Sequence, residues 1–420
     1  MNIKLGYGTG FQSANVPEKN ILKTLKPNEV SRTGNPASSG DPATLVIEAL
    51  ANPIGSPALG EILNPGEKIA IITSDITRPM PTWQVLPHVL DELYSAGVSP
   101  EGITLVFALG SHRPHTEEEK MKLAGARAYG EIACVDSNPL DCIHMGTTSR
   151  GTPIDITRAV AEADRRICLG NIEYHYFAGY SGGIKALMPG ASTPAAIQAN
   201  HSMMIDDNAR AGKLDGNPLR EDLEEAAHIC PIDFIVNVVL NEHKEIVCAV
   251  AGDVVKAHRR GCEFLDSLYK VRIPCRADIV IVSQGGAPKD LNLYQTQKAL
   301  DNSKHAVKDG GTIILVGACR EGLGQKIFEE WITEAEQPND LITRVKNDFK
   351  LGGHKAAAIA MVLKRANIKL VSEMDFDFVK SIFMEPYSDL QSAIDDALAF
   401  HGEDAEIIVM PYGGSTLPVE

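Results

Sequence analysis

Short apolar runs alternate with helix-like segments along most of this chain, and that alternation constrains the fold more than any other feature. Residues 68–73 form one such run, and apolar side chains then follow at the spacing of a helix: Val85, Leu86, Val89, Leu90 and Leu93. Residues 103–109 and 166–172 repeat the apolar run. Runs that are apolar throughout are typical of parallel strands covered by helices on both faces. The sequence therefore predicts an α/β fold with mostly parallel sheets.

The alternation is interrupted once and then restarts, which predicts two α/β domains. Two apolar runs, 233–241 and 245–251, flank a polar turn and predict an antiparallel hairpin, and helical spacing follows over about 253–270. Strands are then predicted at 277–283, 312–317, 367–372 and 405–410, with helices at about 293–308, 324–335, 340–349, 354–365 and 387–400. We expect a first domain over 1–262, a helical hinge over 253–275, a second domain over 273–410 and a tail over 411–420. The stretch 31–42 has the composition of a loop.

Composition excludes several classes of partner. The chain of 420 residues carries 40 Lys and Arg against 55 Asp and Glu, a formal charge of −15, and it has no basic block. Nucleic acid needs clustered Lys and Arg, so no nucleic-acid partner is expected. No apolar run reaches the roughly 18 residues of a membrane helix, so no membrane partner is expected. The eight cysteines are scattered without a Cys-x-x-Cys pair, which predicts free thiols in a reducing cytoplasm.

Side chains suited to proton transfer and anion binding follow several of the predicted strands. They are Asp75 and Arg78 after the first run, His112 after the second, His175 and Lys185 after the third, and Tyr294, Gln295 and Lys298 after the run at 277–283. Ligands of open α/β sheets bind beyond the carboxyl ends of the strands. The convergence predicts a site for a small anion with groups for proton transfer.

Most of these residues also have a plainer explanation. Asp75 can form an Asx turn, and Arg78 can pair with a surface carboxylate. A lone His112 is more often a loop residue than a base, and His115, just before a predicted helix, is expected to be solvated. The glycines of the third segment can be ordinary turn glycines, since they match neither a P-loop nor a Rossmann fingerprint.

The spacing of the remaining histidines leaves a metal site open. His175, Lys185 and His201 are separated by 10 and 16 residues, which matches no simple zinc motif. Imidazole suits nickel, copper, iron and zinc alike. His354 follows two glycines and can open a helix near the pocket.

Taken together, several blocks of the sequence resemble the lactate racemase family, the nickel-pincer-nucleotide enzymes. The matching blocks are Ser74-Asp75-Ile76-Thr77-Arg78-Pro79, Gly110-Ser111-His112-Arg113-Pro114, the segment from Glu173 to Gly190, His201, and Tyr294-Gln295 with Lys298. The block His-Tyr-Phe-Ala-Gly-Tyr-Ser-Gly-Gly-x-Lys-x-x-x-Pro-Gly is specific to that family. The resemblance covers most of the chain.

The resemblance implies two α/β domains with the active site in the cleft between them, the second domain closing over the substrate. It implies a cofactor built on a pyridinium mononucleotide with two sulfur-containing arms, which hold nickel through two sulfurs and a ring carbon. Proteins that build this cofactor are implied partners. The site residues that it implies are Lys185 as the covalent tether, His201 as the nickel ligand, His112 and His175 as the acid/base pair, Arg78, Tyr294, Gln295 and Lys298 as substrate contacts, and Asp75 as a nucleotide contact.

The implied reaction inverts the Cα configuration of a 2-hydroxy acid, making the protein a racemase or epimerase. Simple removal of the Cα proton beside a carboxylate is difficult, whereas hydride transfer through a planar 2-keto acid avoids the carbanion. Reaching both enantiomers requires a proton acceptor on each side, which two histidines provide. Arg78 can hold a carboxylate in bidentate fashion, and Lys298 adds positive charge where an alkoxide develops.

Two departures from the lactate-specific pattern bear on the substrate. Tyr174 stands where a proline is expected, and His115 is an unexpected polar residue in its loop. As extra donors they favour a substrate larger or more polar than lactate. Two other functions stay open: a nicotinamide-dependent 2-hydroxyacid dehydrogenase, for which no phosphate-binding fingerprint is found, and a non-catalytic protein that binds carboxylates or the cofactor.

Overall fold

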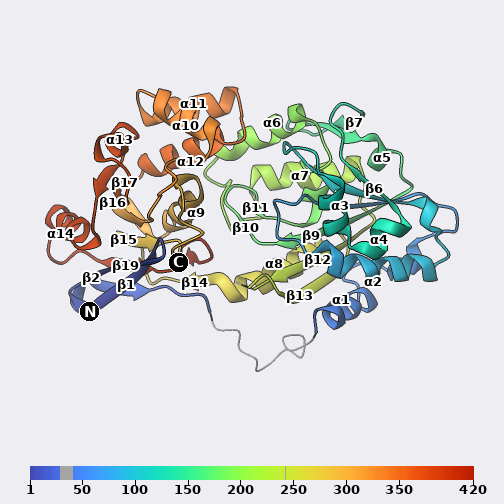
Figure 1. The fold of residues 1–420 in the computed structure, drawn as a ribbon, viewed down its shortest axis with the longest axis horizontal. Coiled ribbons are helices and arrows are strands. Elements are labelled where there is room, and N and C mark those ends of the chain that lie inside the picture. Colours follow the sequence, from blue (N-terminus) through green and yellow to red (C-terminus); the bar gives the residue numbers. More distant parts are fainter. Residues whose placement is uncertain (29–40, 242) are drawn as a thin grey trace. The chain divides into compact units, whose positions relative to one another are not determined.

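The computed structural model describes residues 1–28, 41–241 and 243–420, which form two compact units. One unit comprises Met1–Glu29 with Ser267–Glu420, and the other comprises Val30–Asp266. Each is an α/β unit, as the sequence predicts, and Figure 1 labels their helices and strands. The loop expected over 31–42 lies outside the described residues except for its last two positions, where Asp41 precedes helix α1 (Pro42–Ala51).

The middle of the chain, Val30–Asp266, is built on one mixed sheet. Its strands run in the order β13 (Ile246–Gly252), β12 (Phe234–Leu240), β9 (Arg165–Ile172), β4 (Ile69–Ser74), β5 (Ile103–Ala108) and β6 (Ala133–Asp136). All neighbouring pairs are parallel except β12 and β13. These two form the predicted antiparallel hairpin. The predicted strands 68–73, 103–109 and 166–172 correspond to β4, β5 and β9.

Both faces of the central strands of this sheet are covered, which explains why those strands are mostly apolar. Successive side chains of a strand point to opposite faces. Accordingly, Ile69 and Ile71 of β4 belong to one buried cluster, whereas Ala70 and Ile72 belong to another. Helix α2 (Thr82–Ser95) packs its apolar residues into the first cluster, and α7 (Pro218–Ile229) packs its own into the second.

The unit that contains both termini has a sheet whose neighbouring strands are all parallel. Its strands run in the order β18 (Glu385–Tyr387), β17 (Ala366–Val371), β16 (Val307–Val316), β15 (Ala277–Ser283), β19 (Ile407–Met410) and β3 (Ile21–Thr24). Besides the short α13 (Phe376–Ser381), the helices that follow these strands are α9 (Leu293–Ser303), α10 (Lys326–Glu334), α11 (Pro338–Asn347), α12 (Gly353–Leu363) and α14 (Leu390–His401). They correspond to the helices that the sequence predicts here.

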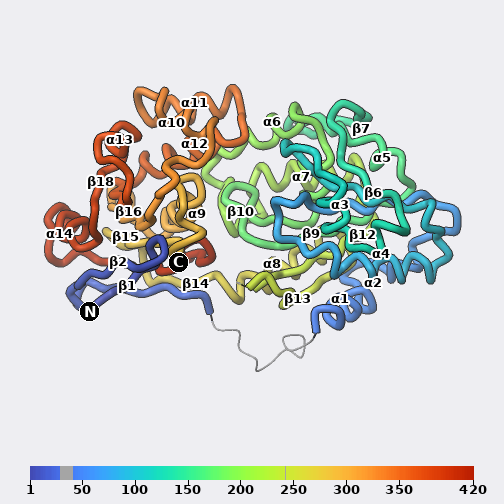
Figure 2. The backbone as a smooth tube through the Cα atoms, viewed as in Figure 1, coloured from blue at the N-terminus to red at the C-terminus, as the bar shows by residue number. Residues whose placement is uncertain are grey.

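The two ends of the chain depart from the expected division into 1–262 and 273–410. Strand β3 extends the sheet by pairing with β19, and the hairpin of β1 (Asn2–Tyr7) and β2 (Gly10–Asn15) adds Ile3 and Leu5 to the core of the same unit. Residues 1–28 therefore belong with the C-terminal part (Figure 2). The segment 411–420 is more than a tail, because β20 (Leu417–Val419) pairs with β14 (Lys270–Arg272). The boundary between the units falls inside α8 (Lys256–Tyr269), within the expected hinge.

Candidate active site

Six of the residues predicted to form the site lie in Val30–Asp266, beyond the carboxyl ends of its strands. Asp75 and Arg78 follow β4, and His112 follows β5. The chain after β9 carries the other three residues: His175 in the short strand β10 (Tyr174–His175), Lys185 in the single turn η5 (Gly183–Ala186), and His201 in α6 (Pro194–Ser202). Tyr294, Gln295 and Lys298 lie in α9 of the other unit, in the segment that follows β15.

Asp75 and His112 form a hydrogen-bonded pair. Nδ1 of His112 lies 2.8 Å from Oδ2 of Asp75, and the Thr77 hydroxyl donates to Oδ1 of the same carboxylate at 3.0 Å. Burial alone would raise the pKa of Asp75, but the hydrogen bond and charge of His112, the Thr77 hydroxyl and the Arg78 guanidinium together lower it below its usual value. An ionised Asp75 accepts the proton on Nδ1, so the neutral ring presents Nε2 as its basic nitrogen.

The buried ring of Phe177 brings together three residues that are far apart in the sequence. Its centroid lies 4.4 Å from that of His175 and 4.9 Å from that of His201, both in edge-on geometry. The Lys185 ammonium lies over the same ring, 5.9 Å from its centroid. The backbone N–H of Ala178 donates to Nδ1 of His175 at 3.3 Å, so the neutral ring of His175 carries its proton on Nε2.

Lys185 is placed by a turn that only glycines can form. Gly182 and Gly183 adopt φ of +76° and +59°, and a Cβ at Gly183 would lie 2.9 Å from the ring of His258. These are turn glycines, as the plainer explanation held, but the turn positions the lysine. Burial, followed by the positive charges of Arg78 and Arg220, lowers the pKa of Lys185 to about 7. Much of this amine is therefore neutral and nucleophilic near neutral pH.

Replacing Lys185 with Met is expected to stabilise the protein without cofactor. The folded state releases this proton near pH 7, whereas an exposed lysine holds it to about 10.5. The folded state therefore carries the full penalty of the buried charge below pH 7, and the penalty disappears as pH rises towards 10.5. We expect the free energy of unfolding to rise by about 2–4 kcal/mol at pH 6 and hardly at all at pH 10.5. Denaturant unfolding measures this, and a Lys122→Met variant, changed on an exposed helix face, serves as the control.

His201 is oriented by a buried polar network that the sequence gives no signal for. Its Nδ1 lies 3.1 Å from Oδ1 of Asn200. The Asn200 amide is itself fixed, because its Nδ2 donates to Oδ2 of Asp222 at 2.8 Å and to the Leu219 carbonyl at 3.2 Å. Oδ1 of Asn200 thus accepts from Nδ1–H, and Nε2 of the neutral His201 ring carries the lone pair that a metal requires.

The residues present fit the implied cofactor. Lys185 offers a partly neutral amine for an acyl attachment, Arg78 and Arg220 place positive charge around it, and His201 offers one imidazole nitrogen. Within the described residues, His, Cys, Asp and Glu form no cluster of three or more that could hold a metal ion by itself. The resemblance implies only one metal ligand from the chain, so the lack of such a cluster among the described residues does not conflict with the implied cofactor.

The donors expected at Tyr174 and His115 are both used within the protein. The Tyr174 hydroxyl donates to Oδ1 of Asp266 at 2.9 Å, beside the Tyr180 hydroxyl at 2.8 Å, and burial followed by Asp266 raises the pKa of Tyr174. His115 is 8% exposed and both its ring nitrogens are hydrogen-bonded. The expectation that His115 is solvated is therefore wrong, and neither residue is a spare donor for a polar substrate.

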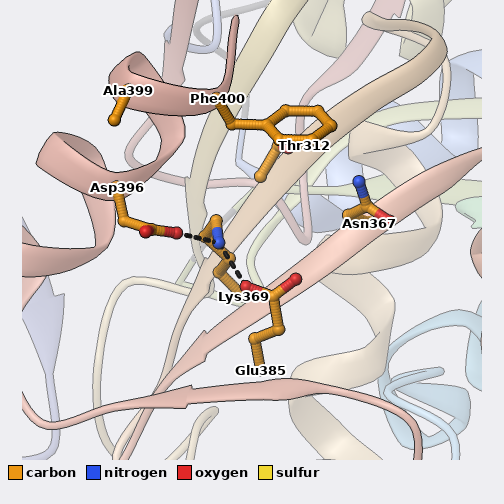
Figure 3. A pocket seen from close by; sticks show the side chains of 7 residues that line it. All are labelled: Thr312, Asn367, Lys369, Glu385, Asp396, Ala399 and Phe400. Atoms are coloured by element: carbon orange, nitrogen blue, oxygen red, sulfur yellow. Dashed lines mark hydrogen bonds and ion pairs between the residues drawn. The ribbon is translucent and has the colours of Figure 1, made fainter.

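Two features of the unit that contains the termini involve none of the residues named above for the site. A cavity of about 340 Å³ is lined by Thr312, Asn367, Lys369, Glu385, Asp396, Ala399 and Phe400, none of them a predicted site residue (Figure 3). The Lys369 ammonium pairs there with Glu385 and with Asp396, as the dashed lines of Figure 3 show. His354 lies in the first turn of α12, as predicted, and its Nδ1 accepts from the Gly352 backbone N–H at 2.9 Å.

Comparison with known proteins shows which class of enzyme has this fold. Residues 7–212 match the family described as lactate racemase N-terminal domain, and residues 273–417 match the lactate racemase C-terminal domain. The chain is 34% identical to a lactate racemase of Thermoanaerobacterium thermosaccharolyticum over 99% of both chains, and 35% identical to one of Lactiplantibacillus plantarum over 98% of both.

Solved structures show the same similarity at the level of the fold. The lactate racemase apoprotein from Thermoanaerobacterium thermosaccharolyticum superposes with a TM-score of 0.88 at 32% identity and full coverage of both chains. A protein from Thermotoga maritima has a TM-score of 0.63 at 20% identity, over 90% of this chain and 99% of that one, which shows a shared fold. Fold and sequence together define a racemase, an enzyme of the isomerase class. The chain belongs to the lactate racemase family.

Among residues 1–28, 41–241 and 243–420, no helix is both long enough and apolar enough to cross a membrane.

Proposed function

We propose that this protein inverts the Cα configuration of a 2-hydroxy acid, lactate or a larger relative, with a nickel-pincer nucleotide attached to Lys185. The observation that carries the proposal is the convergence of Lys185, His175 and His201 on the ring of Phe177. Family membership supports the reaction class, and the position of the low-pKa amine supports the attachment.

In this proposal the chain's own residues bind the acid and move its hydroxyl proton. Arg78 is exposed and suits a carboxylate, which a guanidinium holds through two parallel hydrogen bonds. Tyr294, Gln295 and Lys298 are the proposed substrate contacts of α9, where Lys298 would stabilise negative charge on the substrate oxygen. Asp75 keeps the His112 ring in one tautomer and is the proposed contact to the nucleotide.

Proton transfer is assigned to the two histidines, whose neutral rings differ in tautomer. Nε2 of His112 carries a lone pair, because Nδ1 of the same ring donates its proton to Asp75. Nε2 of His175 carries a proton, because Nδ1 of that ring accepts from the backbone N–H of Ala178. His112 can therefore accept the hydroxyl proton through Nε2 and return it. His175 presents an N–H that can donate a hydrogen bond to the substrate oxygen, and it acts as an acid only as imidazolium and as a base only once that Nε2 proton has left. His201 is the proposed metal ligand. When bound, the nickel-pincer nucleotide supplies hydride acceptance and return, so that the substrate passes through its planar 2-keto acid.

Two further parts of the proposal concern the surroundings of the enzyme. The proteins that build the cofactor are proposed partners, because Lys185 offers a point of attachment for a cofactor that has to be made beforehand. The cytoplasm is the proposed location. Every cysteine lies in the described part of the chain and all eight are free thiols, which suits a reducing compartment.

The test is a chirality assay over a panel of single-enantiomer 2-hydroxy acids. The protein is produced together with cofactor-building proteins, its nickel content is measured, and products are separated by chiral chromatography. We expect about one nickel per chain and conversion of at least one acid to its mirror image, unchanged by added NAD. Formation of reduced nicotinamide would instead identify a dehydrogenase. No inversion of any acid by nickel-loaded protein would identify a binding protein.

A further inference from the structure

One buried imidazole connects the ends of three neighbouring strands. His115 lies beyond β5, and its Nδ1 is 2.6 Å from Oδ1 of Asp136 at the end of β6. On the other side, Nε2 of His115 accepts from the backbone N–H of Ile76, in the loop after β4, at 3.0 Å. The side chain is 1% exposed and its ring packs edge-on against Phe107, with centroids 5.4 Å apart.

The two partners define the tautomer of His115 without ambiguity. A backbone N–H can only donate, so Nε2 must carry a lone pair. The carboxylate of Asp136 accepts the proton on Nδ1, and its other oxygen accepts the backbone N–H of His115 at 2.9 Å. Asp136 therefore fixes both the backbone and the ring of His115. The imidazole is buried and neutral, and both its donor and its acceptor are hydrogen-bonded. It therefore holds the loop after β4 and the loop after β5 at a fixed separation.

The loops that His115 connects are those of the proposed proton-transfer pair. Ile76 is the residue between Asp75 and Thr77, and both neighbours contact the ring of His112. His112 lies three residues before His115 in the same loop. The bond from Ile76 to His115 thus ties the Asp75 turn to the His112 loop at a second point, in addition to the contact between Asp75 and His112.

We propose that His115 is a positioning residue, which holds the Asp75 turn and the His112 loop at the separation that their hydrogen bond requires. This role goes beyond the assignments made above and rests on the proposed function only for its effect on catalysis. Nε2 holds the Asp75 turn by accepting the hydrogen bond from Ile76, whereas the contact of Nδ1 with Asp136 fixes the position of the ring. The two functions of the ring can therefore be separated by substitution.

A matched pair of variants separates them. In His115→Gln, the side-chain carbonyl can reach the position of Nε2 and accept from Ile76, while the donor to Asp136 is lost. In His115→Asn, the shorter amide can replace Nδ1–H and donate to Asp136, while the acceptor for Ile76 is lost. Each variant removes the aromatic ring and one hydrogen bond, so a purely structural role predicts similar effects for the two.

The first measurements use the protein without cofactor and do not depend on the proposed reaction. In 15N-histidine spectra, with His115 assigned by its absence from His115→Gln, we expect the Nδ1–H tautomer in the wild-type protein. The Ile76 amide is expected to exchange with solvent about tenfold faster in His115→Asn than in the wild-type protein or in His115→Gln. An Nε2–H ring in the wild type, or equal exchange in the two variants, would overturn the proposal.

The kinetic measurement uses cofactor-loaded enzyme on an acid that the wild type inverts. We expect kcat to fall about tenfold or more in His115→Asn with KM changed less than about twofold, and His115→Gln to keep most of the wild-type kcat. His144→Ala, which removes an exposed His–Asp contact between β7 (Cys142–Thr147) and β8 (Pro153–Thr157), is the control and should match the wild type. Equal losses in the Gln and Asn variants would refute the positioning role. A wild type that inverts no acid would count against the proposed function and leave the cofactor-free measurements to decide on the positioning role.

Discussion

Lys185→Arg protein, produced together with the cofactor-building proteins, is expected to carry no covalently attached cofactor and to invert no substrate. The guanidinium of arginine stays protonated and positively charged at any working pH. It therefore cannot form the acyl bond that a neutral amine can. Lys185 is suited to that bond because burial and the charges of Arg78 and Arg220 lower its pKa to about 7. Intact-mass measurement should show added mass on the wild-type chain and none on the variant.

The control separates attachment from folding. Lys122→Arg, on an exposed helix face, should gain the same mass as the wild type and retain its activity. Because Lys185→Arg puts a permanent charge where the lysine is partly neutral, its folding is checked by denaturant unfolding, and Lys185→Met, which is expected to fold more stably than the wild type, should likewise gain no mass. Added mass on Lys185→Arg, located by peptide mapping to a different lysine, would show that Lys185 is not the tether. Added mass nowhere in the wild type, with full activity, would show that the cofactor is held without a covalent bond.

The interior of each sheet could be predicted because its central strands are mostly apolar. β4, β5 and β9 lie between two helical layers, so most side chains of these runs are apolar on both faces. The ends of the chain could not be predicted in the same way. β3 is a four-residue strand, Ile21–Thr24, that is only partly buried, and its place beside β19 depends on contacts nearly 400 residues away in sequence. Short edge strands carry too few apolar residues to reveal their partner.

The candidate site also contains residues whose positions the sequence predicts and others whose positions it does not. Asp75, Arg78 and His112 could be anticipated because the carboxyl ends of neighbouring parallel strands meet at one edge, and the structure brings Asp75 and His112 into contact. The positions of Phe177 and Asn200 could not be anticipated, since one is an apolar residue among glycines and the other acts through Asp222 on another helix. The burial of His115 could not be predicted, because a polar residue before a helix gives no sign of burial. Its partners, Ile76 and Asp136, come from two other loops.

His112→Gln is expected to lower the rate of inversion by about 10²–10⁴-fold in both directions, because one of the two proton-transfer groups is lost. Asp75→Asn should have a loss of similar size despite its nearly identical shape. Its amide can turn a donor towards Nδ1 of His112, which favours the tautomer with the proton on Nε2 and removes the base. Both rates are measured by chiral chromatography with each enantiomer in turn, at equal cofactor loading.

The pH profile of activity tests whether Asp75 or an imidazole sets the acidic limb. The pKa of Asp75 is already lowered in the folded protein, so this carboxylate stays ionised throughout the neutral range, and its contribution to stability is lost only as pH falls through that lowered value. The acidic limb of the wild-type activity should therefore follow an imidazole and disappear or shift in the variants. Thr77→Val, which removes only the hydroxyl beside Asp75, should cost less than about tenfold. If His112→Gln kept more than about a tenth of the wild-type rate, His112 would not be the base.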